Sequence, residues 1–283
     1  CQCIHIWIMP HRIKLSLPLN NSSVKRMEFF TYRMPPFLNV MGALYIVVAA
    51  PFLISLLREG YWRGVFHQIG VNLKHVWMAL IVALPLILLI INYLDIPATL
   101  AVKAMDTYTH SYVFWDFICS CAEGGFVGGV LFTLFMSANY FKLNKLAVCA
   151  KISLMSSIYA GLANAVLKFL FNRQRPAIGL EQWHFFAFFE SSVKNFNELT
   201  YAFNSMPSGH VISTVAAVVP FFLAYKLKSI RISLIIWVLM VAFSRVYTIN
   251  HWLSDVMVSS LLGMLIGFAV YQVNFWRIEH HEN

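Results

Sequence analysis

A twelve-residue stretch near the carboxyl end of the chain combines three side chains that could carry out acid–base or nucleophilic chemistry. Residues 244–255 have the sequence SRVYTINHWLSD, with Arg245, His251 and Asp255. His251 and Asp255 are four residues apart, so on a helix they would share a face. A carboxylate placed there can hold an imidazole in one tautomer and stabilise its cation, as a histidine nucleophile or base requires. Taken alone, the stretch is more typical of a polar turn with an i,i+4 pair.

A second cluster supplies two more cations. Lys168 precedes Arg175 by seven residues, which is nearly two helical turns. Both side chains therefore lie on about the same face if the helix extends that far, and Pro176 would then help to end it. Each cation by itself is equally typical of a basic side chain reaching for the membrane interface.

The third cluster, PSGH at residues 207–210, begins an apolar run. Ser208 is a good N-cap and Gly209 lets the backbone come close to a ligand, while the unpaired amides of a helix start favour an anion. A single His210 in this position is more often part of a capped or wetted helix end than a catalyst.

Taken together, the three clusters indicate phosphate chemistry. Three cationic side chains and a helix N-terminus would cradle a tetrahedral oxyanion, and arginine offers bidentate contacts to phosphate. Two histidines beside such a cradle could supply a nucleophile and an acid. Ionisable groups at membrane depth are costly, which favours a functional role for them.

The composition identifies the class of protein. The chain has 283 residues, of which 59% are hydrophobic and 12% are charged, too apolar for a soluble domain of this length. The net charge of +9 is then more typical of basic cytoplasmic loops than of nucleic-acid binding. The five cysteines show no metal-site spacing with nearby histidines, and we assign them no role.

Apolar runs predict an all-α integral membrane protein with a core bundle of six spans. The predicted spans are residues 76–94, 124–141, 152–171, 210–225, 232–250 and 253–276. A further apolar run, 34–57, is interrupted by Pro51, so a re-entrant segment, an interfacial segment and a seventh span all remain open.

We expect three regions along the chain. Residues 1–33 form a basic tail that is not necessarily native, because the sequence begins with Cys1 and Met27 and Met34 are plausible starts. Residues 34–74 form a peripheral apolar segment with a basic loop, and residues 75–276 form the membrane domain that carries the site.

The distribution of lysine and arginine predicts the orientation. The connections 58–74, 142–151 and 226–231 are basic, whereas 95–122 and 177–206 are balanced or acidic. Basic connections are retained in the cytoplasm, so the other two are expected outside. All three clusters then lie on the outer side.

The three clusters in this order resemble the signature of the type-2 phosphatidic acid phosphatase superfamily. The matching segments are Lys168-x6-Arg175-Pro176, Pro207-Ser208-Gly209-His210 and Ser244-Arg245-x5-His251-x3-Asp255. The resemblance covers roughly residues 75–275, with every signature position occupied.

The resemblance implies a two-step mechanism. His251, oriented by Asp255, attacks phosphorus to give a phosphohistidine, while His210 protonates the leaving lipid alkoxide and later deprotonates water. The phosphate-binding groups would stabilise the charge on the equatorial oxygens. They are Lys168, Arg175, Arg245, the Ser208 hydroxyl and the Ser208 and Gly209 amides. The resemblance implies no metal and no cofactor, because the protein supplies the cations.

These observations predict a lipid-phosphate phosphatase at the outer face of a membrane, most typically a bacterial inner membrane. The expected partners are membrane lipids and a lipid phosphate, with no nucleic acid. Candidate substrates are undecaprenyl diphosphate, phosphatidylglycerol phosphate, phosphatidic acid and lipid A phosphates. The alternatives are a lipid phosphotransferase with a polyprenyl diphosphate donor and a non-catalytic lipid binder or transporter.

Overall fold

The computed structural model describes residues 54, 61–105, 108–189 and 202–279, and every regular element in these residues is helical. The elements are α3 (Tyr61–Tyr93), α4 (Asp95–Lys103), α5 (Tyr108–Cys121), α6 (Gly124–Tyr140), α7 (Asn144–Phe171), the 3₁₀ turn η1 (Ala187–Phe189), α9 (Gly209–Ala224), α10 (Lys228–Tyr247) and α11 (Leu253–Glu279). Predictions for residues 1–53 and 55–60 lie outside the described residues.

Several of these helices are long and apolar enough to cross a membrane. In the described part of the chain they are Arg63–Tyr93, Asn144–Phe171, Lys228–Tyr247 and Leu253–Asn274. The pair Ser111–Cys121 and Gly124–Tyr140, bent by 57°, meets the same criteria together, and α9 is apolar but shorter. All six predicted spans are thus helical, and the all-α membrane class is confirmed.

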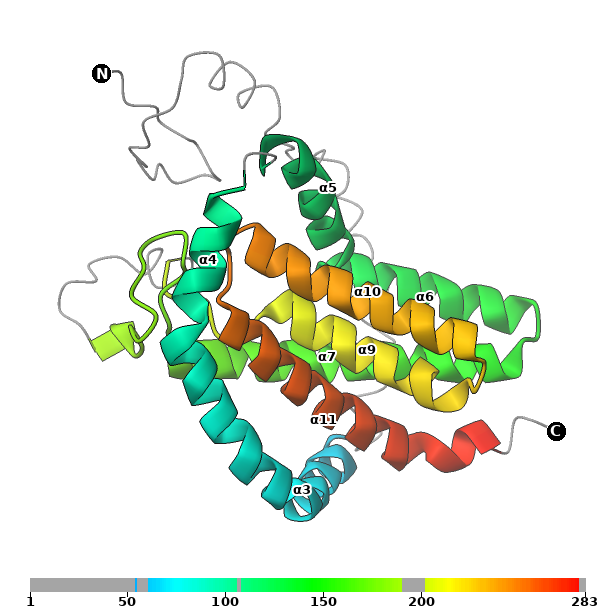
Figure 1. The fold of residues 1–283 in the computed structure, drawn as a ribbon. Helices are drawn as coiled ribbons and strands as arrows, with labels where there is room; N and C mark the ends of the chain where they lie inside the picture. The colour runs from blue at the N-terminus through cyan, green and yellow to red at the C-terminus, as the bar shows by residue number, and fades with distance from the viewer. Residues whose placement is uncertain (1–53, 55–60, 106–107, 190–201, 280–283) are drawn as a thin grey trace, which may run out of the picture.

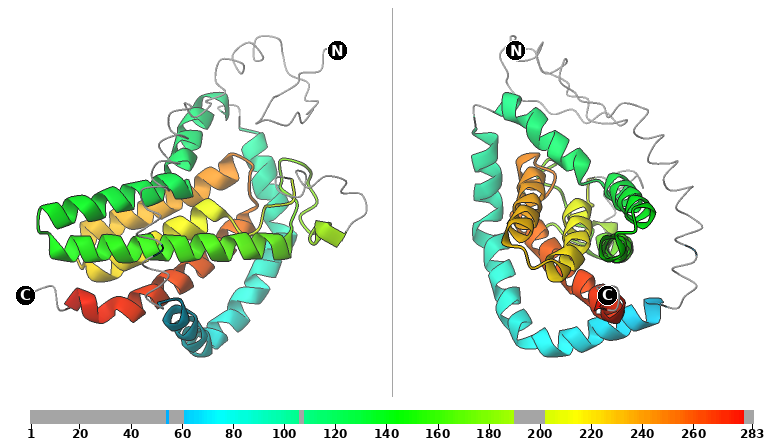
Figure 2. Two further views of the ribbon diagram at one scale, coloured as in Figure 1. Left: turned by 180° about the vertical axis from the view of Figure 1, so that it is seen from behind. Right: turned by 90° about the vertical axis from the view of Figure 1, so that its right-hand side faces the viewer.

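Helix α9 lies at the centre of the bundle. It packs against α7, α11, α10 and α6, and Figure 1 and both views of Figure 2 show it enclosed by these longer helices. Its first turns bury Val211, Ile212, Val215 and Ala216 against the neighbouring helices. The start of α9 is therefore held rigidly, which matters because the PSGH segment leads into it.

Two glycines allow α11 to come very close to α9. A methyl group at Gly263 would lie 2.7 Å from the carbonyl oxygen of Ile212, and one at Gly267 would lie 2.8 Å from that of Ala216. Gly263 and Gly267 are four residues apart, so they form a small-residue stripe of the kind that lets membrane helices approach backbone to backbone.

The loop after α7 begins and ends on neighbouring backbone segments. Asn172 ends α7 in the left-handed conformation with φ 42°, which asparagine tolerates better than most residues. Downstream, the Arg175 amide donates to the Ala202 carbonyl at 2.8 Å, and the Ser205 amide donates to the Arg173 carbonyl at 3.0 Å. These two hydrogen bonds form the stem of the loop.

Two predicted connections contain helices. Helix α3 begins at Tyr61, so most of the 58–74 stretch that we predicted as a basic loop is helical. Lysine and arginine favour helix as much as leucine does, so the charges there do not mark the end of a helix. The predicted outer connection 95–122, expected as a mixed and partly helical loop, contains α4 and α5, and α5 forms an apolar bent pair with α6.

The close contact between α9 and α11 generates a prediction about stability. Gly263→Ala and Gly267→Ala should each destabilise the protein by about 1–3 kcal/mol, because the added methyl groups overpack against backbone atoms that cannot move aside. The apparent melting temperature of the purified protein in detergent measures the effect.

Gly161→Ala on α7 is the matched control. A methyl group at Gly161 meets no atom within 4 Å, and alanine favours helix by about 1 kcal/mol over glycine. The control should melt at the wild-type temperature or above. Equal melting temperatures for all three variants would contradict the packing argument.

Candidate active site

The predicted site residues come from helix ends that gather at one end of the bundle. The last turns of α7 and α10 and the first turns of α9 and α11 meet there beside α4, as Figure 1 shows. Those helix ends and the adjoining loops carry Lys168, Arg175, Ser208, Gly209, His210, Arg245, His251 and Asp255.

The electrostatics of His251 show that the predicted cations surround it. His251 lies in the turn between α10 and α11 and is buried. Its burial, followed by the charges of Arg245, Arg175 and Lys168, lowers its pKa well below the ordinary value for histidine. The same three cations are charged neighbours of His210. His251 is therefore neutral at pH 7 and surrounded by cationic side chains.

The tautomer of His251 follows from a single contact. Its Nδ1 lies 2.6 Å from the backbone carbonyl oxygen of Ser205. A carbonyl oxygen only accepts hydrogen bonds, so Nδ1 must be the protonated nitrogen of the neutral ring. The lone pair then resides on Nε2, the nitrogen that could act as a nucleophile.

Asp255 was expected to orient the imidazole of His251 by direct contact, but the structure shows an indirect connection. Its Oδ2 is 3.8 Å from Nδ1 of His251, too far for a hydrogen bond. Instead, Oδ2 accepts from the Ser205 hydroxyl at 2.5 Å and from the Trp252 amide at 2.9 Å, and Oδ1 accepts from Arg173 at 2.5 Å. Asp255 thus reaches the imidazole through Ser205, whose hydroxyl it binds and whose carbonyl orients the ring.

The geometry of Lys168 and Arg175 also differs from the sequence argument. Helix α7 ends at Phe171, well before Pro176, so the two cations do not share a helical face. Arg175 is instead placed by the loop: Nη1 donates to Asn250 Oδ1 at 3.1 Å and Nη2 to the Asn204 carbonyl at 3.4 Å. The two cations nevertheless converge on the same histidine.

The start of α9 partly fits the predicted anion site. Ser208 occupies the N-cap position, but its hydroxyl makes no capping hydrogen bond and is buried without a hydrogen-bond partner among the described residues. Its amide donates to the Ser259 hydroxyl at 2.6 Å, so in this structure the amide is already used, and its predicted contact with phosphate would have to replace that hydrogen bond. The Ser208 hydroxyl remains as a group that could bind phosphate.

Arg245 is held in place by a thiol. Its Nη1 donates to Sγ of Cys119 at 3.2 Å, and that thiol donates to the Ser244 hydroxyl at 3.2 Å. The Nε of Arg245 is buried without a hydrogen-bond partner in the described segments. An arginine with a fixed side chain and an unused donor is suited to binding an oxyanion.

Sequence reasoning missed Ser205 and Arg173. Ser205 contributes chiefly a carbonyl group, which any residue type has, so no pattern could have indicated it. Arg173 lies between Lys168 and Arg175, and a third charge so close to a predicted span was a usable signal.

No group of three or more His, Cys, Asp or Glu side chains in the described ranges could hold a metal ion.

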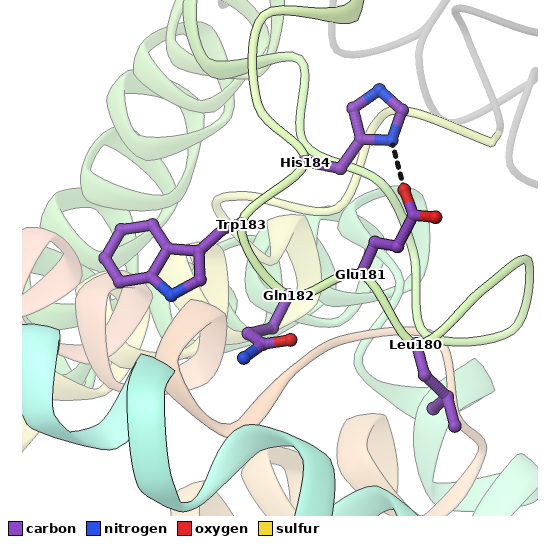
Figure 3. A pocket seen from close by; sticks show the side chains of 5 residues that line it. All are labelled: Leu180, Glu181, Gln182, Trp183 and His184. Atoms are coloured by element: carbon purple, nitrogen blue, oxygen red, sulfur yellow. Dashed lines mark hydrogen bonds and ion pairs between the residues drawn. The ribbon is translucent and has the colours of Figure 1, made fainter.

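A shallow pocket opens in the loop after α7. Figure 3 shows its lining of Leu180, Glu181, Gln182, Trp183 and His184, with Oε2 of Glu181 3.2 Å from Nδ1 of His184. None of the predicted site residues lines it. The pocket is joined to α3 by the Trp183 indole, which donates to Asn92 at 3.0 Å.

The segment that holds the predicted site is similar to a known family. Residues 149–279 match the family model of the PAP2 superfamily, the type-2 phosphatidic acid phosphatases, and this range contains every predicted site residue. The crystal structure of LpxE from Aquifex aeolicus is similar, with 22% sequence identity and a TM-score of 0.48 over 63% of this chain and 95% of that one. No curated protein matches the sequence. Residues 149–279, the segment that holds the whole predicted site, are thus identified by this match as a PAP2-superfamily segment.

Proposed function

We propose that this membrane lipid phosphatase hydrolyses a lipid phosphomonoester or diphosphate through a phosphohistidine on His251, at the outer face of a bacterial inner membrane. The observation that carries the proposal is the hydrogen bond from Nδ1 of His251 to the Ser205 carbonyl. It leaves an unprotonated Nε2 among Lys168, Arg175 and Arg245. A neutral imidazole in a cationic cradle is suited to attack a phosphate group.

In the first step, the Nε2 lone pair of His251 forms a bond to phosphorus, and the bond from phosphorus to the lipid oxygen breaks. The electron pair leaves with that oxygen, which takes a proton from His210. The negative charge of the bound phosphate offsets the three cations beside His210 and so favours the protonated imidazole that this step needs. The charge on the transferring group is stabilised by the three cations and the Ser208 hydroxyl.

In the second step, His210 takes a proton from water as the water oxygen bonds to phosphorus. The bond from phosphorus to Nε2 breaks, and inorganic phosphate leaves. The imidazole regains its starting tautomer because Nδ1 keeps its proton and its contact with Ser205 throughout.

The surroundings of the site support a lipid substrate. The site lies at the ends of apolar helices, where a headgroup would be placed if those helices cross the membrane. The neighbouring loop exposes Trp183, Phe186 and Phe189, and aromatic side chains of this kind are enriched at membrane interfaces. Undecaprenyl diphosphate, phosphatidylglycerol phosphate, phosphatidic acid and lipid A phosphates all offer the required group.

The roles of the two histidines can be separated experimentally. His251→Ala should abolish phosphate release from lipid phosphates and from p-nitrophenyl phosphate, because no nucleophile remains. His210→Ala should abolish turnover of lipid substrates. With the p-nitrophenyl ester it should accumulate phosphoenzyme, because that leaving group needs no acid while the water step still needs a base.

The measurement is phosphate release and acid-quenched labelling of the purified protein. His184→Ala is the control, because His184 lies outside the cradle on the neighbouring loop. Wild-type turnover by His251→Ala would refute the proposed nucleophile. Trapping the phosphoryl group on an added lipid hydroxyl rather than on water would identify a phosphotransferase.

The two arginines of α10 provide a matched pair for testing the cradle. Arg245→Met should lower kcat/KM by about 100- to 1000-fold, the typical cost of removing one donor from an oxyanion site. Arg231→Met should retain activity, because Arg231 lies at the other end of α10 and donates to the carbonyls of Phe222 and Tyr225. Equal kcat/KM for the two variants would contradict the role of Arg245.

The proposed orientation can be tested by labelling introduced cysteines. In a chain whose native cysteines are replaced by alanine, a membrane-impermeant maleimide added to spheroplasts should modify Glu181→Cys and not Leu227→Cys. Both positions are exposed, and they lie on loops at opposite ends of the bundle. Inside-out vesicles should give the reverse pattern, and labelling of Leu227→Cys from outside would place the site on the inner face.

A further inference from the structure

Arg173 is a fully buried cation placed between two fully buried carboxylates. Its Nη1 is 2.5 Å from Oδ1 of Asp255, and its Nη2 is 2.8 Å from Oδ2 of Asp95, with all three side chains 0% exposed. Asp95 begins α4 and Asp255 lies in the first turn of α11. One guanidinium therefore joins three segments that are far apart in the sequence.

Every donor of Arg173 is used within the protein. Nη1 also donates to the Ser254 hydroxyl at 2.7 Å, while Nε and Nη2 donate to the Gln182 carbonyl at 3.0 and 2.6 Å. With the two carboxylates, this accounts for all five N–H groups of a guanidinium. Its faces are covered by the rings of Phe185 and Trp252, at 4.8 and 5.4 Å from Cζ. Arg173 consequently has no donor left for a phosphate, unlike Arg245, whose Nε has no hydrogen-bond partner among the described residues.

Asp95 holds two groups in place: the Arg173 guanidinium and the first turn of α11. Its Oδ1 accepts from the Ser254 amide at 2.9 Å, and its Oδ2 accepts from the Ser254 hydroxyl at 2.5 Å. A carboxylate that accepts hydrogen bonds from the first turn of a helix is also favoured by the helix dipole. The residue after Ser254 is Asp255, so Asp95 constrains the backbone that carries the carboxylate next to the nucleophile.

We propose that Arg173, held by Asp95, is a positioning residue that aligns His251 for attack on phosphorus. The alignment passes from Arg173 to Asp255, from Asp255 to the Ser205 hydroxyl at 2.5 Å, and from the Ser205 carbonyl to Nδ1 of His251 at 2.6 Å. The proposal rests on the proposed function, because it assigns His251 as the nucleophile.

The backbone supplies a second route to the same result. The Arg173 carbonyl accepts from the Ser205 amide at 3.0 Å, so Arg173 holds Ser205 directly as well as through Asp255. Ser205 is thereby held at both its amide and its hydroxyl while its carbonyl orients the imidazole. Only the side-chain route is lost on substitution, and this makes the variants informative.

The test compares steady-state kinetics of the full-length protein in detergent. Arg173→Met should lower kcat by about 100-fold, the typical effect of a misplacement of about 1 Å at a reacting group, with KM little changed. The inhibition constant of inorganic phosphate should also stay at the wild-type value. Arg175→Met provides the contrast, because it removes a cradle cation and should raise that inhibition constant.

A double variant distinguishes positioning from a general loss of structure. Arg173→Met leaves Asp95 and Asp255 buried together without their cation, and two such carboxylates repel each other. Asp95→Asn removes one of these charges. Asp95→Asn combined with Arg173→Met should therefore turn over faster than Arg173→Met alone. If the two substitutions only damaged the structure independently, their losses of activity would add and the double variant would be slower.

Arg173→Lys covers the case in which Arg173→Met does not fold. Lysine keeps the charge but cannot contact both carboxylates with a rigid fork, so kcat should lie between those of wild type and Asp95→Asn/Arg173→Met with KM unchanged. The proposal would be overturned if Arg173→Met kept the wild-type kcat. It would also be overturned if the single variants Arg173→Lys and Asp95→Asn both kept the wild-type kcat. A wild-type protein that releases no phosphate from any lipid phosphate would instead refute the proposed function.

Discussion

The arrangement of the active site depends on a buried guanidinium that compensates two buried carboxylates. An unpaired charge inside an apolar bundle is very costly, so Arg173, Asp95 and Asp255 are stable there only as ion pairs. Because the pairs must form, α4, the loop after α7 and the start of α11 are fixed in a single arrangement. The bundle itself is held together by apolar packing, but this ion network determines how its polar end is assembled.

The same end of the bundle contains a second group of charges with a different purpose. Burial keeps the pKa of His251 low, and the charges of Arg245, Arg175 and Lys168 lower it further. The mutual repulsion of these cations disfavours the free site, and in the proposed reaction a bound phosphate relieves it. Arg173 is neutralised by the protein, whereas in the proposed reaction these three cations are neutralised by the phosphate of the substrate. Two functions of arginine thus occur within three residues of one loop.

Much of this structure could be predicted from the sequence. Apolar runs located all six core helices, and the spacing of charged residues indicated which ends would meet. The length of α3 was missed, because its basic residues were taken to mark a connection, and the connection 95–122 is more helical than the partly helical loop expected there. The shared helical face of Lys168 and Arg175 was also wrong, because Asn172 ends α7 by a change of backbone conformation. Ser205 could not be found, because a backbone carbonyl is not encoded by residue type.

The stem of the loop after α7 has a consequence for how such a protein can change. Hydrogen bonds from Arg175 to Ala202 and from Ser205 to Arg173 close the loop at its base, before the chain reaches the pocket of Figure 3. The segment beyond the stem can therefore change in length only where it does not hold Arg173, because the Gln182 carbonyl accepts from the Arg173 guanidinium and the Phe185 ring covers it. Part of this loop is thus tied to the arrangement of His251, and the remainder can vary while the residues below the stem keep their places.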